Sequence, residues 1–97
     1  MSYELHPAAE AELAVAAKYY AEEATVRVAE AFLAEFERVA ELLGGHQRLG
    51  TPARSGLRVF PFHRFPYSLV YRESTNGPCI YAVAHHKREP GYWASRL

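Results

Sequence analysis

A periodic run of apolar residues between Thr25 and Gly45 constrains the fold of this chain more than any other feature. Five large apolar residues recur there at intervals of 4, 4, 3 and 4, namely Val28, Phe32, Phe36, Val39 and Leu43. This spacing places them along one side of an α-helix. Thr25 is suited to cap the first turn, and Gly44-Gly45 to end the helix in a left-handed conformation. The pattern predicts an amphipathic helix that buries one side.

An alanine-rich segment before that helix predicts a second helix to pack beside it. Residues 8–23 read AAEAELAVAAKYYAEE and have high helix propensity. Pro7 is well placed at the first helical position, because its missing N–H would be unpaired there anyway. The link to Thr25 is short, which predicts an antiparallel helical hairpin. Helical spacing assigns its buried side to Leu13, Ala16, Ala17 and Tyr20.

After Gly45 the sequence changes from a helical to an extended pattern. Residues 46–56 are rich in Gly, Pro, Ser and Thr without an apolar period, and predict a loop. Pro61 indicates an edge strand or a bulge in the strand that follows, and an Asn-Gly turn signal precedes the last strand. That last strand is nearly continuous in apolar residues and is expected to be central. The three predicted strands cover residues 57–65, 67–73 and 79–86.

With a short strand over residues 2–6, the predicted order is β-α-α-β-β-β. This is an α+β fold in which the helical hairpin covers one face of a mainly antiparallel sheet. Ninety-seven residues fit one domain spanning residues 1–97. No apolar run is long enough to span a membrane, and the N-terminus lacks the pattern of a secretory signal. The lone Cys79 cannot form an internal disulfide, so a reducing, cytoplasmic setting is expected.

The two halves of the chain carry opposite charges. Residues 1–45 hold nine glutamates and three cationic side chains, a net charge of −6, whereas residues 46–97 hold eight cationic side chains and two glutamates, a net charge of +6. One interpretation is that the basic half faces an anionic partner, either nucleic acid or an acidic protein segment. The other is that the two halves attract each other within the fold. The number of arginines favours the partner.

Several common chemistries lack their motifs in this sequence. There is no Gly-rich phosphate loop, no nucleophile elbow, no CxxC and no aspartate. His85 and His86 are adjacent on a predicted strand and so point to opposite faces, which prevents them from holding one metal ion without a bulge. We therefore expect neither a metal nor a cofactor. Cys79 lies among apolar strand residues and is predicted to be structural.

What remains is a cationic and aromatic set on the predicted sheet and the C-terminal tail. Arg58 and Arg64 share one face by parity, and Arg72 is expected to extend that row on the next strand. Arginines bind phosphates or anionic transition states, and aromatic rings stack on bases. A solvated basic face with aromatic side chains filling the core edge is the alternative. The candidates for binding a target or nucleic acid are Arg64, Arg72, His86, Lys87, Trp93 and Arg96.

Three blocks of the sequence resemble a known toxin family. They read HPAAEAEL followed by YY, then RFPYSLVYR, then YAVAHHKREPGYWASRL, and their order and spacing match over nearly the whole chain. On these blocks the chain resembles the RelE/ParE superfamily of type II toxin–antitoxin toxins. The resemblance implies a β-α-α-β-β-β fold and a growth-inhibiting toxin. It also implies a cognate antitoxin that wraps the toxin in a hetero-oligomer and represses the shared operon.

Two activities divide that superfamily: RelE-like members cut mRNA on the ribosome without a metal, and ParE-like members poison DNA gyrase. The RelE-like alternative implies catalytic roles for Arg58 and Arg88, with Tyr92 or Trp93 nearest to the family's tyrosine. The lysines that such enzymes carry before the arginine strand have no counterpart, because that segment reads TPARSG. VAHHKREP is more similar to ParE-like members. DNA gyrase is therefore the favoured target, ahead of an mRNA endonuclease or an inactive toxin-fold binding module.

Overall fold

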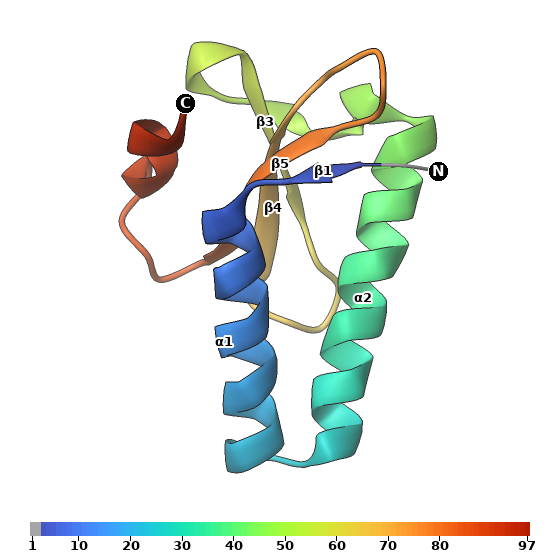
Figure 1. Ribbon diagram of the computed structural model, residues 1–97, viewed down its shortest axis with the longest axis vertical. Coiled ribbons are helices and arrows are strands. Elements are labelled where there is room, and N and C mark those ends of the chain that lie inside the picture. Colours follow the sequence, from blue (N-terminus) through green and yellow to red (C-terminus); the bar gives the residue numbers. More distant parts are fainter. Residues whose placement is uncertain (1–2) are drawn as a thin grey trace.

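Two antiparallel helices form one layer of the protein, and a sheet of five strands forms the other (Figure 1). The computed structural model describes residues 3–97. The first strand, β1 (Glu4–Leu5), is shorter than the strand predicted over residues 2–6, of which Ser2 lies outside the described residues. Helix α1 (Pro7–Glu23) and helix α2 (Val26–Gly45) follow it as the predicted hairpin.

Local hydrogen bonds explain where the two helices begin. His6 Nδ1 accepts a bond from the Ala8 N–H at 3.0 Å, and Pro7 occupies the first helical position as predicted. Thr25 Oγ1 accepts a bond from the Val28 N–H at 3.1 Å, which confirms the predicted cap of α2. Each cap satisfies an N–H that has no partner within its own helix.

The predicted end of α2 is wrong. The helix continues through Gly44 and Gly45 and ends at His46, whose φ is −146° rather than left-handed. The Leu42 carbonyl accepts a hydrogen bond from the His46 N–H at 3.0 Å, so the helical pattern of bonds passes through both glycines. No left-handed residue is needed when a following N–H satisfies the last turn in this way.

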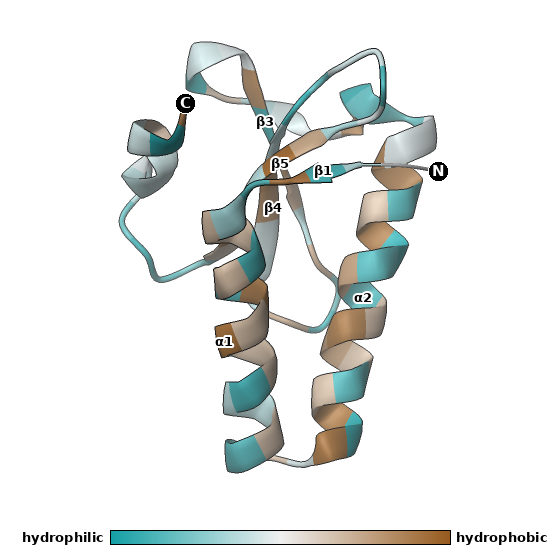
Figure 2. Cartoon of the chain, viewed as in Figure 1, coloured by the Kyte–Doolittle hydropathy of each residue, from teal (hydrophilic) through white to brown (hydrophobic). Residues whose placement is uncertain are grey.

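The apolar stripe of α2 is the centre of the core, as predicted. Figure 2 shows apolar bands along the helix separated by hydrophilic ones. The stripe packs on the sheet face formed by Leu69, Tyr71, Ile80 and Val83. Leu13, Ala17 and Tyr20 of α1 pack against the same cluster. Four members of the stripe are fully buried, namely Phe32, Phe36, Val39 and Leu43.

The sheet has the order β1-β5-β4-β3-β2, with β1 parallel to β5 and all other neighbours antiparallel. This confirms the predicted fold class and the interior position of the last strand. One strand was not predicted, because β2 lies inside the segment assigned to a loop. The remaining strands are β2 (Thr51–Pro52), β3 (Leu57–Pro61), β4 (Tyr67–Arg72) and β5 (Cys79–His85).

Strand β3 stops at Pro61 instead of continuing to residue 65. Pro61 has no N–H to donate to a neighbouring strand, and the chain then turns back toward β4. Arg64 lies in this turn with a left-handed φ of 69°. Within the described part of the chain, residues 3–97, neither helix is long and apolar enough to cross a membrane.

Candidate functional site

Glu12 of α1 fixes the C-terminal tail to the rest of the protein. Its carboxylate accepts two hydrogen bonds from the Arg96 guanidinium, both at 2.9 Å, and one from the Tyr92 hydroxyl at 2.6 Å. The fourth bond comes from the backbone N–H of Val83 in β5 at 2.9 Å. Four donors on two oxygens saturate the carboxylate and join α1, β5 and the 3-10 turn Tyr92–Arg96.

This network also protects the outer edge of β5. Within the described residues 3–97, strand β1 pairs with β5 at Cys79 and Ile80, and no strand covers the rest of that edge. Glu12 takes the Val83 N–H there, and Arg96 donates to the Tyr81 carbonyl at 2.9 Å. Side chains thus satisfy backbone groups that would otherwise be open to another strand.

Burial and hydrogen bonds within the network shift the pKa values of Glu12 and Tyr92. Burial would raise the pKa of Glu12, but the hydrogen bonds from Arg96, Tyr92 and Val83 outweigh it and hold that pKa below its ordinary value. Burial, together with the bond to Glu12, raises the pKa of the Tyr92 hydroxyl well above its ordinary value. Tyr92 therefore stays protonated at neutral pH, and its hydroxyl donates a hydrogen bond to the ionised Glu12 carboxylate.

The Arg88 side chain lies outside this hydrogen-bond network. Its guanidinium stacks on the Tyr92 ring, 3.8 Å from the ring centroid, and its side chain is exposed. The three ion pairs formed among residues 3–97 join other residues. Arg88 is thus an exposed cation that a partner can reach, since the stacking contact does not neutralise its charge.

Two hollows lie on either side of Arg88. The first, which we call the helix groove, has a volume of about 310 Å³ and lies between α1 and the end of β5. Its lining includes Ala11, Val15, Ala16, Tyr67 and Val83, with Arg88 and Tyr92 from the tail. The second, the sheet hollow, has a volume of about 160 Å³ and lies on the face away from the helices. Its lining includes Val59, Ser68, Ala84, His86, Arg88 and Trp93.

The adjacent histidines serve opposite faces of the sheet, as predicted. The His85 ring meets Tyr67 edge-on at a centroid distance of 4.9 Å, on the side of the helices. His86 Nε2 lies 3.0 Å from Ser68 Oγ and lines the sheet hollow. Trp93 packs with Tyr92 against the small apolar cluster of Leu57, Val70, Ala82 and Ala84. Its indole therefore closes one side of the core and also borders the hollow.

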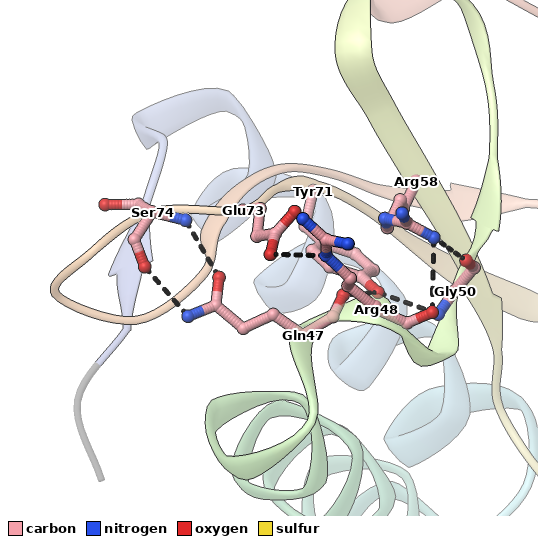
Figure 3. Close-up of polar contacts among 7 residues, drawn as sticks. All are labelled: Gln47, Arg48, Gly50, Arg58, Tyr71, Glu73 and Ser74. Carbon is pink, nitrogen blue, oxygen red and sulfur yellow. Dashed lines mark hydrogen bonds and ion pairs between the residues drawn. The ribbon is translucent and has the colours of Figure 1, made fainter.

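Arg58 has a different environment (Figure 3). Its Nη1 donates to the Gly50 carbonyl at 2.8 Å and to the Arg48 carbonyl at 3.2 Å, which holds the segment before β2 in place. The Tyr71 hydroxyl fastens the same segment, because it donates to the Gln47 carbonyl at 2.6 Å and accepts from the Gly50 N–H at 2.9 Å. Gly50 has to be small here, since a Cβ would lie 2.5 Å from the Tyr71 hydroxyl oxygen.

Arg58 does not lie beside Arg88, although the RelE-like alternative assigns both of them to one catalytic site. Arg58 pairs with Tyr71, whereas β5 leaves the sheet at His85, which pairs with Tyr67. Four residues along β4 separate these two positions, which is roughly 13 Å at the rise of a strand. Arg58 and Arg88 therefore lie toward opposite ends of the strands.

The predicted row of arginines is also wrong. Arg64 lies in the turn after β3 and not on the strand. Arg72 pairs with Leu57, while Arg58 pairs with Tyr71, so Arg72 and Arg58 face opposite sides of the sheet. The guanidinium of Arg72 lies 5.5 Å from the centre of the Tyr81 ring. Lys87 is exposed at the start of the tail, next to Arg88.

Attraction between the two charged halves accounts for little of the charge segregation. Among residues 3–97, only the Arg96–Glu12 ion pair joins a cation of the second half to a glutamate of the first. The Arg48–Glu73 and Arg38–Glu35 pairs each lie within one half. The basic half therefore keeps most of its charge available, which supports an anionic partner.

Sequence reasoning missed Glu12 and Ser68. Glu12 lies in an alanine-rich helix, and its partners are 71 to 84 positions away along the chain. Ser68 is a buried residue in a strand of apolar neighbours, and only the folded sheet brings it to His86. The available signal for Glu12 was its position in the helix, next to Leu13 and four residues before Ala16 on the predicted buried side.

Comparison with known proteins identifies the fold. A solved structure described as a chromosomal ParDE toxin–antitoxin system from P. aeruginosa matches with a TM-score of 0.75 and 20% sequence identity. The match covers 88% of this chain and 95% of that one. Among curated proteins no relative matches.

The family follows from the sequence match. Residues 3–90 match the model of the ParE toxin of type II toxin–antitoxin systems. The match ends at Pro90, so the roles of Tyr92, Trp93 and Arg96 depend on the contacts described above. Because the match spans most of the 97 residues, this chain belongs to the ParE toxin family of type II toxin–antitoxin systems.

Proposed function

We propose that this ParE-family toxin arrests growth by inhibiting DNA gyrase in the cytoplasm, and that a cognate antitoxin neutralises it. Family membership implies an antitoxin partner and supports the ParE-type target. The observation that carries the choice of gyrase over mRNA is the dispersal of the three residues that a RelE-like nuclease would use. The Arg58 guanidinium donates to backbone carbonyls, and the Tyr92 hydroxyl donates to Glu12. The strand register also separates Arg58 from Arg88.

We assign a different partner to each of the two hollows beside the tail. The helix groove is mainly apolar with Arg88 at its border, a combination that suits an apolar antitoxin segment carrying a carboxylate. The sheet hollow combines Trp93, His86 and Arg88 on the face away from the helices, with Lys87 exposed nearby. Tryptophan and arginine are enriched among residues that dominate binding energy, so this hollow is our candidate for contact with the target.

The proposal is tested with purified toxin and DNA gyrase. We expect the toxin to block supercoiling of relaxed plasmid or to trap cleaved DNA, and to leave translated mRNA intact. Arg88→Ala is expected to weaken this inhibition by about tenfold, because it removes a central cation from the contact. Arg27→Ala is the matched control, since Arg27 is an exposed arginine on α2 that borders neither hollow.

Two results would contradict the proposal in different ways. Codon-phased cuts in translated mRNA, seen by primer extension and lost in Arg88→Ala, would assign the chain to the nuclease alternative. Normal growth during strong expression, together with normal supercoiling, would instead favour an inactive binding module. The Arg27→Ala control distinguishes a specific loss in Arg88→Ala from a general effect of removing surface charge.

A further inference from the structure

Arg88 and His85 are the two residues that line both the helix groove and the sheet hollow. His85 is fixed, because its Nδ1 accepts a hydrogen bond from the Lys87 N–H at 3.0 Å and its ring packs edge-on against Tyr67. The Arg88 side chain is exposed, and among residues 3–97 its one contact is the stacking on the Tyr92 ring. Of the two shared residues, Arg88 is therefore the one that can turn toward either hollow.

Acidic neighbours do not hold Arg88 in place. Glu12 lines the helix groove, but its two oxygens already accept four hydrogen bonds from Arg96, Tyr92 and Val83. Glu89 is next to Arg88 in the sequence, and within residues 3–97 no ion pair joins the two. A carboxylate brought by a partner would thus find Arg88 unneutralised.

The two hollows lie on opposite faces of β5. Val83 lines the helix groove and packs with the helices, whereas Ala84 lines the sheet hollow and packs with Trp93. A guanidinium that binds a carboxylate with both of its forked N–H groups has a fixed plane and direction. Arg88 can point this fork to one face of the strand at a time.

We infer that the helix groove and the sheet hollow compete for Arg88, so that an antitoxin carboxylate in the groove withdraws this cation from the target-binding hollow. The inference rests on the proposed function and adds the way in which the antitoxin neutralises the toxin. The antitoxin can then neutralise the toxin even though its binding site does not overlap the target-binding site. Because binding coupling is reciprocal, target binding also weakens antitoxin binding to the same extent.

Three substitutions test the inference, each chosen for the hollow it borders. Val15 lines only the helix groove and is 69% exposed, so Val15→Glu changes that surface without disturbing the core. His86 is exposed and lines only the sheet hollow, so His86→Ala changes that one. Arg88→Ala changes both. Antitoxin affinity is measured by calorimetry with the purified cognate antitoxin, and target action by inhibition of gyrase supercoiling.

We expect the loss in Val15→Glu to fall on antitoxin binding and the loss in His86→Ala to fall on gyrase inhibition. Arg88→Ala should lower both, each by about tenfold, a typical effect for a residue central to an interface. In a competition experiment, antitoxin should displace the wild-type toxin from gyrase. We expect Arg88→Lys to keep weak but measurable binding to both partners. Antitoxin should displace this variant from gyrase less than it displaces the wild type, because lysine lacks the fork.

The possible failures are distinguishable. If Arg88→Ala lowers only one of the two activities, Arg88 is not shared and the inference is wrong, while the proposed function stands. If antitoxin displaces wild type and Arg88→Lys from gyrase equally well, the two partners exclude each other because their binding sites overlap. This result also overturns the inference. A wild-type toxin that leaves gyrase active overturns the proposed function and the inference with it. Thermal unfolding of each variant confirms that the fold is intact.

Discussion

Replacing Glu12 by alanine is expected to lower the free energy of unfolding by about 3 kcal/mol. The side chains of Glu12 and Arg96 are only 17% and 16% exposed, so the variant leaves a nearly buried guanidinium without its carboxylate. It also leaves the Tyr92 hydroxyl and the Val83 N–H without an acceptor. The tail should detach from α1, and urea unfolding followed by circular dichroism measures the loss.

Glu10→Ala is the matched control for that variant. Glu10 is an exposed glutamate in the first turn of the same helix, so its removal changes the charge without breaking the network. We expect an effect within about 0.5 kcal/mol, as for most surface substitutions. Equal losses in the two variants would show that the network adds no stability and that the tail is held by packing alone.

The contribution of Glu12 should also depend on pH. Its pKa in the folded protein is below the ordinary value of 4.5, so the stabilisation is fully present above that value and is lost as the pH falls through the folded pKa. The difference in stability between wild type and Glu12→Ala should therefore be smaller at about pH 3 than at neutral pH. Urea midpoints at the two pH values test this, and a constant difference would mean that Glu12 is not titrating in this range.

Replacing Tyr71 by phenylalanine is expected to cost about 2 kcal/mol of stability, because a buried N–H and a carbonyl lose their partner. The Tyr71 hydroxyl is the acceptor for Gly50 and the donor to Gln47, and its ring is fully buried. The ring itself is retained, so packing against the core should change little. Proteolysis should become faster in the segment between α2 and β3, which this hydroxyl fastens.

Tyr81→Phe removes the same atom at a different place and serves as the control. The Tyr81 ring is half-buried and stacks with Arg72 and His6, and among residues 3–97 its hydroxyl has no hydrogen bond. We expect no measurable loss of stability. If Tyr71→Phe is equally neutral, solvent replaces the lost bonds, and the segment before β2 is held by Arg58 and by the contacts of Gln47 with Ser74 and of Arg48 with Glu73.

The elements that sequence reasoning predicted well are those specified by neighbours in the chain. The stripe of α2, the Thr25 cap and the Pro7 start depend on contacts within one or two helical turns. The ending at Gly44-Gly45 failed because the His46 N–H, rather than a left-handed glycine, satisfies the last turn. The short strand β2 escaped prediction because two residues carry no periodic pattern and depend on β3 for their hydrogen bonds.

Strand register was the main source of error for the site. Parity within β3 holds only up to Pro61, where the chain turns and removes Arg64 from the strand. The relation between strands depends on which residues pair, and Leu57 pairs with Arg72. A one-residue shift in register reverses the face of every side chain, and the sequence of a single strand does not contain that information.

The sequence by itself determined the helical hairpin, the extended second half, the segregation of charge and the resemblance to a toxin superfamily. All of these depend on local propensity, periodicity and composition. Only the tertiary structure decided that Arg58 supports a loop, that Glu12 secures the tail, and that Arg88 stands unneutralised between two hollows. The contacts of Arg58 and Glu12 join residues 8 to 84 positions apart, and they exist only once strand register and helix packing have placed these side chains together.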